Sequence, residues 1–290
     1  MQTAYLIGSY GQYRHLRRLL TALLEAPGSA CYVHLNRRYA APADLPTGPR
    51  IHYVARLPVY WGGWSHQLAI LRTLERAFHD GADRYVLLSG TDYPVRPVAT
   101  LQGCLSREVD YINLLEGFHA HKPEWRVRRW HFDNFDRRAR HHWRTFLYRG
   151  VERLIQPLLA RHHYPFERVY HGSTWWALRH ATVAYVLEFL RTHPEYVRFF
   201  RRAWCPEECL FPTILGNSHL RQRCRTNLTY TDWSTTPAPA VLTRAHLELL
   251  ARRETFDGVY GPYRPLFARK FLDTSGTLID WADEHLRLAT

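Results

Sequence analysis

Short apolar runs alternate with amphipathic stretches through the first third of the chain. The apolar runs predict buried strands over residues 4–7, 30–35, 51–54 and 85–88. Between them, apolar residues recur three or four positions apart, which predicts helices over 13–24 and 66–77. This alternation is typical of βα units that build a largely parallel sheet.

The second half of the chain has a less regular pattern. It predicts strands over 175–178 and 228–230, and helices over 182–191, 207–215, 244–253 and 279–288. No apolar run approaches the roughly 18 residues of a membrane span, and no stretch of Pro, Gly or Ser is long enough to act as a linker. We therefore expect one compact α/β domain over residues 1–290, without a transmembrane segment.

The five cysteines are an odd number and contain no Cys-x-x-Cys pair. They suggest neither a disulfide framework nor a zinc site, so we expect a reducing, cytoplasmic location. The formal net charge of +13 would attract nucleotides, anionic lipid or nucleic acid, without specifying which.

Much of this charge lies in the basic segment, residues 122–168, which holds twelve Lys and Arg against five Asp and Glu. Aromatic residues are interleaved with these arginines, a combination that can stack on sugars or bases or lie on an anionic membrane. Residues 146–159 have the pattern of an amphipathic helix, and its aromatic residues can equally face the core. These alternatives stay open at the level of sequence.

Seven groups of residues together resemble one known family. They are AYLI at 4–7 with YVHL at 32–35, VYWGGWS at 59–65, LSGTDYP at 88–94, GSTWWAL at 172–178, CPEE at 205–208 with TIL at 213–215, YTDW at 230–233 and FARKF at 267–271. Their order and spacing are similar to those of the core-2/I-branching N-acetylglucosaminyltransferases, a family that includes the peptide O-xylosyltransferases. Each group alone is weak, whereas seven in register are specific.

The resemblance implies a GT-A-like fold with a mixed, mostly parallel sheet flanked by helices. It implies an inverting glycosyltransferase that moves a sugar of the GlcNAc or xylose type from a UDP-sugar to a hydroxyl of a glycan or glycolipid. Residues 1–115 would bind the nucleotide-sugar, and residues 116–290 would hold the acceptor and the catalytic groups.

Three small residues and one acid are predicted to contact the donor. Gly62 and Gly63 precede a helix and would bring backbone N–H groups close to a diphosphate or uridine, with Ser65 as a cap of that helix. Asp92 follows a strand, where it could accept hydrogen bonds from a sugar hydroxyl or cap the turn before Pro94.

Many GT-A enzymes hold a divalent metal between an Asp-x-Asp pair and the diphosphate, and this sequence has no such pair near the predicted site. We therefore expect no metal and no other cofactor, and side-chain cations must meet the charge of the leaving diphosphate. Arg269 and Lys270 match the position of basic residues that take this role in the resembling family. A further family arginine is missing upstream, where Arg244 or Arg264 could substitute.

Inverting transfer also needs a carboxylate that removes the proton of the acceptor hydroxyl. Glu208 matches the family glutamate that serves as this base, and Glu207 replaces the family aspartate beside it. Both also suit the first turn of a helix after Pro206, where carboxylates are common caps.

Acceptor contacts are predicted at Glu116, Lys122 and Arg126, whose order echoes acceptor-sugar contacts in the core-2 enzymes, and at Trp175 and Trp233 in two of the shared motifs. The same chemistry on nucleic acid, such as glycosylation of a hydroxymethylated pyrimidine in DNA, is a second possibility. A non-catalytic sugar- or nucleic-acid-binding protein is a third, disfavoured by the presence of Glu208 and Lys270.

Overall fold

The fold was analysed in a computed structural model of the chain. The structure describes residues 1–137, 139, 141–236 and 238–288. Arg138 and Arg140 of the basic segment lie outside the described residues.

A seven-stranded sheet forms the centre of the protein, in the order β10-β6-β9-β4-β1-β2-β3. Its strands are β1 (Thr3–Ser9), β2 (Ser29–Leu35), β3 (Ile51–Tyr53), β4 (Arg84–Ser89), β6 (Asp110–Ile112), β9 (Trp176–Arg179) and β10 (Cys224–Arg225). All neighbours pair in parallel except β9, which runs antiparallel to both β4 and β6. Because β9 and β10 come from the second half of the chain, both predicted functional halves contribute to one sheet.

Three smaller sheets lie around the central one. A three-stranded sheet orders β11 (Thr229–Thr231), β14 (Phe267–Arg269) and β5 (Asp92–Pro94). Two-stranded sheets join β7 (Leu115–Glu116) to β8 (Tyr170–His171) and β12 (Phe256–Gly258) to β13 (Gly261–Tyr263). In the first of these sheets, Arg269 on β14 lies opposite Asp92 on β5, which brings together two predicted donor residues 177 positions apart.

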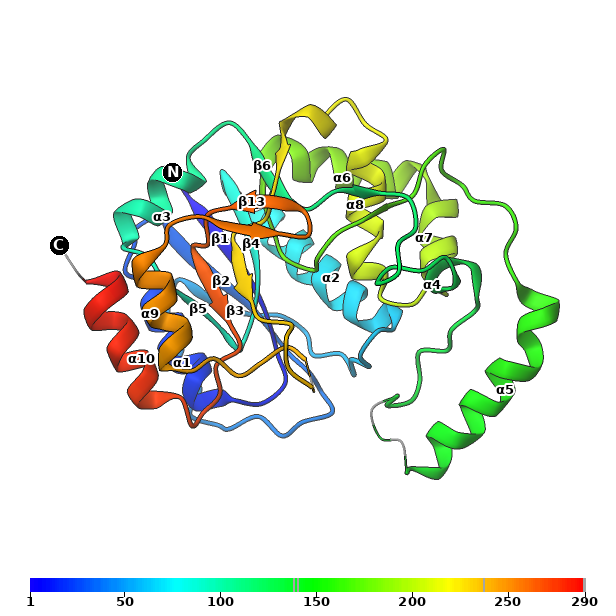
Figure 1. Ribbon diagram of the computed structural model, residues 1–290, viewed down its shortest axis with the longest axis horizontal. Helices are drawn as coiled ribbons and strands as arrows, with labels where there is room; N and C mark the ends of the chain where they lie inside the picture. The colour runs from blue at the N-terminus through cyan, green and yellow to red at the C-terminus, as the bar shows by residue number, and fades with distance from the viewer. Residues whose placement is uncertain (138, 140, 237, 289–290) are drawn as a thin grey trace.

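Helices cover both faces of the central sheet (Figure 1). One core includes apolar residues of α1 (Tyr13–Leu23), α3 (Val98–Leu105), α9 (Arg244–Arg252) and α10 (Gly276–Ala282). The other includes those of α2 (Trp64–Asp80), α6 (His180–Thr192), α7 (Pro194–Phe200) and α8 (Leu210–Gly216). The mixed, mostly parallel sheet with helices on both sides is the GT-A-like α/β fold that the resemblance implies.

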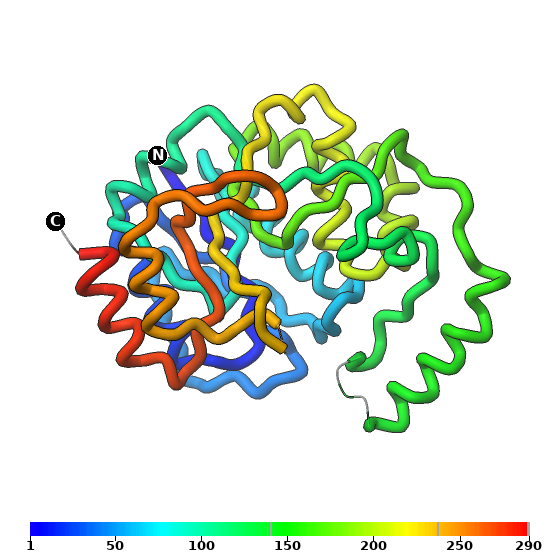
Figure 2. The backbone as a smooth tube through the Cα atoms, viewed as in Figure 1, coloured from blue at the N-terminus to red at the C-terminus, as the bar shows by residue number. Residues whose placement is uncertain are grey.

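The short α4 (Trp125–Arg128) and the long α5 (Trp143–Leu159) lie outside these two layers. Figure 2 shows α5 at the outer edge of the molecule. Among the described residues, no helix has the length and apolar character needed to cross a bilayer.

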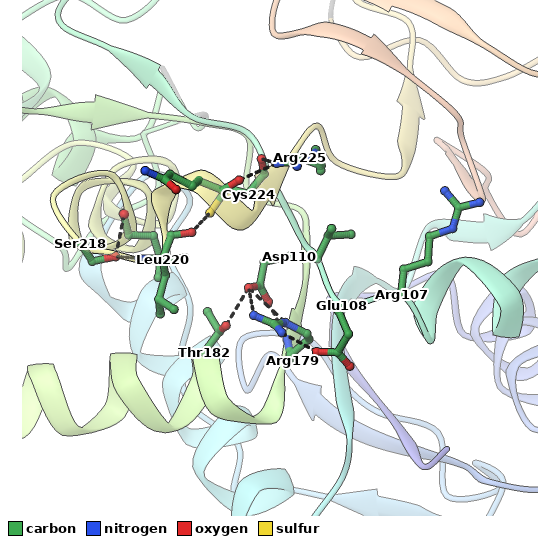
Figure 3. A network of polar contacts seen from close by, with 12 residues as sticks. Arg107, Glu108, Asp110, Arg179, Thr182, Ser218, Leu220, Cys224 and Arg225 are labelled. Atoms are coloured by element: carbon green, nitrogen blue, oxygen red, sulfur yellow. Dashed lines mark hydrogen bonds and ion pairs between the residues drawn. The ribbon is translucent and has the colours of Figure 1, made fainter.

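A buried carboxylate fixes the antiparallel strand within the sheet. Asp110 on β6 is fully buried and accepts hydrogen bonds from the backbone N–H of Arg179, from its guanidinium at 3.1 Å, and from the Thr182 hydroxyl at 2.7 Å (Figure 3). The Arg179 guanidinium also pairs with Glu108 at 2.7 Å. A buried charge with this many partners ties β9 and the start of α6 to β6.

The predicted strands and helices of the first third are confirmed, with small differences at their ends. The predicted helix over 207–215 is wrong in one respect, because the structure divides it into a 3-10 turn over Pro206–Glu208 and helix α8. In a continuous helix, the backbone N–H of residue 212 would donate a hydrogen bond to the Glu208 carbonyl. Residue 212 is a proline, Pro212, and has no N–H. The Glu208 carbonyl accepts instead from the Gly172 N–H at 2.8 Å.

The possibility that the aromatic residues of the 146–159 helix face the core holds for Tyr148, which stacks on the buried Phe135, but is wrong for Phe146. The helix exists as α5, but Phe146 is 81% exposed and Leu158 is 85% exposed. The helix predicted over 279–288 is divided between α10 and a π-helical turn over Asp283–Arg287.

Candidate active site

The carboxylate of Glu208 lies between two cations of the basic segment. Glu208 Oε2 accepts from Lys122 Nζ and from Arg126 Nη1, the latter at 2.6 Å. All three side chains are less than one-fifth exposed. The predicted base and two of the predicted acceptor residues, 82 and 86 positions away from it, therefore form one cluster.

This cluster determines the protonation state of Glu208. Burial alone would raise the pKa of the carboxyl, but Lys122 and Arg126 outweigh burial and lower it below its ordinary value. Glu208 is therefore ionised at neutral pH, which is the form that a general base needs.

Glu207 faces a different partner, His66 on the first turn of α2. Glu207 is buried, and its Oε1 lies 3.1 Å from His66 Nδ1, a contact that is an ion pair when His66 is protonated. Burial would lower the pKa of His66, but Glu207 reverses this and raises it. Glu208 and Arg269 also lie near enough to affect this pKa.

Arg269 is held by Asp92 and Trp175. Its Nε donates to Asp92 Oδ1 at 3.0 Å, and its guanidinium lies 4.4 Å from the centre of the Trp175 ring. Asp92 is fully buried and also accepts from the Ser89 N–H and hydroxyl. These bonds favour the turn-capping role of Asp92 over contact with a sugar hydroxyl. The Trp175 ring lies beside a predicted donor cation, Arg269.

Lys270 follows β14 directly, next to the turn that ends β4. The neighbouring Phe271 N–H donates to the Thr91 carbonyl at 2.9 Å, and the Lys270 carbonyl accepts from the Leu242 N–H at 2.9 Å. This turn lies at the carboxyl ends of β1 and β4, where open parallel sheets bind ligands, although the space between residues 9–12 and residues 90–91 is too small for a water molecule.

The first turn of α2 is already capped from within the chain. The Asp133 carboxylate accepts from both the N–H and the hydroxyl of Ser65, and Gly63 leaves the space that Asp133 occupies, since a Cβ there would lie 2.0 Å from its Oδ1. Gly62 has a φ of 76° and packs against the Trp204 ring. These contacts give all three predicted donor residues a structural role in this turn.

Two predicted acceptor residues lie apart from the Glu208 cluster. Glu116 is half-exposed, pairs with Arg168 and Arg221, and accepts from the Tyr170 hydroxyl at 2.8 Å. Trp233 is 62% exposed in the loop after β11. The structure thus brings together Lys122, Arg126 and Glu208, but not Glu116 or Trp233 with them.

Three residues near the cluster were not predicted: His66, Asp133 and Tyr260. Tyr260 lies in the hairpin between β12 and β13, where burial raises its pKa and Lys122 and Glu208 are near enough to affect it. Nothing in the local sequence marks it, because the hairpin reaches the site only through the tertiary fold. Over the part of the chain that is described, no three His, Cys, Asp or Glu side chains gather as a possible metal site.

Comparison with known proteins identifies the family of the chain. The model of one protein family, described as Branch: Core-2/I-Branching enzyme, matches residues 3–251, which include the central sheet, the Glu208 cluster and α5. A search of curated proteins finds no match. The family match covers most of the chain, and the chain therefore belongs to the Core-2/I-branching enzyme family of glycosyltransferases.

Proposed function

We propose that this glycosyltransferase is inverting and metal-independent, and that it moves a sugar of the GlcNAc or xylose type from a UDP-sugar to a hydroxyl of a glycan or glycolipid. The observation that carries the proposal is the Glu208 carboxylate, ionised between Lys122 and Arg126, with Arg269 near enough to the same histidine, His66, to affect its pKa. An ionised base and a cation that meets the charge of the leaving group are the two elements that inverting transfer requires.

In this mechanism, Glu208 takes the proton of the acceptor hydroxyl as its oxygen attacks the anomeric carbon. The bond from that carbon to the UDP oxygen breaks on the opposite face, and UDP leaves with the bonding electron pair. Lys122 and Arg126 keep Glu208 ionised and lie where hydroxyls of the acceptor would approach it.

Lys270 and Arg269 are proposed to meet the charge of the departing diphosphate. Their backbone lies beside the turn at the carboxyl end of β4, where open parallel sheets bind ligands, which supports a donor site there. Lys270 is proposed for direct contact with the diphosphate, and Arg269, which pairs with Asp92, for a lesser share. Loss of a charge-assisted hydrogen bond from Lys270 would weaken UDP binding by about 1.5–3 kcal/mol.

The proposed setting is a reducing cytoplasm. All five cysteines are free thiols, and four of them are buried. This supports a protein that gains its stability without disulfides.

Replacement of Glu208 tests the proposal. Glu208→Gln should still bind UDP, measured by calorimetry, but turnover should fall by about a hundredfold or more, the scale of a lost general base. Glu207→Gln is the matched neighbour and should lower turnover less. Unchanged turnover in Glu208→Gln would reassign this carboxylate to holding Lys122 and Arg126 in place.

Metal independence is tested separately. Activity should survive excess EDTA, because side-chain cations are proposed to do the work of a metal. Loss of activity in EDTA that manganese or magnesium restores would contradict this part of the proposal.

A further inference from the structure

Helix α5 is amphipathic, but it presents its apolar face to solvent. Its exposed apolar residues are Trp143 (68%), Phe146 (81%), Leu147 (52%), Val151 (37%), Leu154 (78%) and Leu158 (85%). At 3.6 residues per turn, these positions form one stripe along the helix. A continuous apolar surface of this kind marks a contact with another molecule or a membrane.

The opposite face of α5 attaches to the body through polar and aromatic contacts. Glu152 accepts from Arg137 Nη1 and from the Phe132 N–H, each at 2.7 Å. Gln156 exchanges two hydrogen bonds with the Trp130 backbone, and Tyr148 stacks on Phe135 with ring centres 5.2 Å apart. These hydrogen bonds pair the buried Glu152 carboxylate and hold this face of α5 against the body. The apolar stripe on the opposite face therefore points to solvent.

Positive charge borders the stripe. By the helical period, Arg149 and Arg153 lie along one side of it and Arg144 along the other, and all three are exposed. Glu152 is the only acid between residues 143 and 159, and Arg137 neutralises it. The outward face of α5 is therefore apolar at its centre and cationic at its edges.

We propose that α5 is a docking surface for an anionic phospholipid bilayer. The apolar stripe would enter the boundary between headgroups and acyl chains, with the arginines against lipid phosphates and Trp143 at the interface. Charge decides against a second copy of this chain, because two paired stripes would bring six exposed arginines together, while the only acid on each helix, Glu152, is buried and already paired with Arg137. Nucleic acid would meet the arginines but leave the apolar stripe in water.

Vesicle flotation of the full chain tests the docking. We expect binding to vesicles of phosphatidylcholine mixed with phosphatidylglycerol, and weak binding to phosphatidylcholine alone. Phe146→Ser with Leu154→Ser should weaken partitioning by about a hundredfold, since each side chain loses apolar burial. Val259→Ser, which removes an equally exposed apolar side chain on the β12–β13 hairpin, should leave partitioning unchanged.

Two further variants separate the contributions. Arg149→Gln with Arg153→Gln should lower binding to the anionic vesicles by about twentyfold to thirtyfold, as expected for two charges near such a surface. Brominated acyl chains should quench wild-type tryptophan fluorescence, and Trp143→Phe should remove most of that quenching.

Several outcomes would overturn the proposal. They are equal flotation of wild type and the Phe146→Ser/Leu154→Ser variant, equal binding to both vesicle types, a dimer in sedimentation that this variant abolishes, or duplex DNA binding that it abolishes. None of these measurements requires turnover, so the docking surface and the proposed function succeed or fail independently.

Discussion

Helices α2 and α5 are each 17 residues long and each have one apolar and one polar face, yet the fold uses them in opposite ways. Helix α2 buries eight residues, among them Leu71 and Leu74, against the central sheet. Helix α5 buries only Thr145 and Glu152 and leaves its apolar stripe in solvent. Helical periodicity thus identifies an apolar face, while the surrounding structure decides what that face meets.

The difference follows from what each helix is connected to. Helix α2 follows strand β3 after a loop and packs on the sheet, where β1 and β2 cover its apolar side chains. The residues before α5 supply partners for its polar side, including Arg137 and the Trp130 backbone. The pairing of the buried Glu152 carboxylate sets the orientation of α5, whereas the burial of leucine side chains sets the orientation of α2.

The largest expected effect is on stability, through one leucine in each helix. Leu74→Ala in α2 removes a fully buried side chain and should lower the free energy of unfolding by about 2–5 kcal/mol. Leu154→Ala in α5, where the side chain is 78% exposed, should change it by less than about 0.5 kcal/mol. Urea unfolding of both variants measures the contrast, and equal losses would show that α5 is covered in solution.

A second prediction concerns the attachment of α5. Glu152→Gln removes the carboxylate charge to which Arg137 and the Phe132 N–H donate hydrogen bonds. Weakening these bonds should lower the free energy of local opening of α5 by about 1.5–3 kcal/mol. Hydrogen exchange should become faster at amides 143–159 and stay unchanged in α2. Unchanged exchange in α5 would mean that other contacts fix its orientation.

A third prediction compares the caps of the two helices. Asp133→Ala removes the carboxylate that caps α2 through Ser65, and should lower the free energy of unfolding by about 0.5–2 kcal/mol. His142→Ala removes the side chain that caps α5 at the Arg144 N–H, in an exposed helix that adds little to global stability, and should cost less. A larger loss for His142→Ala in thermal unfolding would contradict the comparison.

The smallest expected effect is a pH dependence of the unfolding free energy that arises from His66 on α2. Because Glu207 raises the pKa of His66 in the folded state, this pair stabilises the protein fully below the ordinary histidine pKa of about 6.5. The stabilisation is lost as the pH rises through the higher folded value. The difference in unfolding free energy between wild type and His66→Gln should therefore shrink between about pH 6 and about pH 9.

His142→Gln at the start of α5 is the control for this measurement, since His142 bonds a backbone N–H rather than a buried carboxylate. A wild-type advantage over His66→Gln that grows with pH would rule out the proposed pairing with Glu207.

The candidate site was predictable wherever a short motif carries its own chemistry. Glu208 follows Pro206, Asp92 follows β4, and Lys270 follows Arg269 at the end of β14, while the resemblance to the family supplied the roles of Glu208, Arg269 and Lys270. The joining of Lys122 and Arg126 to Glu208 was not predictable from spacing, because more than 80 residues separate them. His66, Asp133 and Tyr260 lacked any local signal, since each acquires its partner from a distant segment.

The sequence by itself determined the βα order of the first third and the family to which the chain belongs. These features depend on residues close together, on hydrophobic period or on a motif. Tertiary structure alone decided that Asp133 caps α2, that Arg269 rests between Asp92 and Trp175, and that the apolar face of α5 points outward. Burial and ion pairing depend on which distant side chains arrive at the same place, and only the folded chain specifies that.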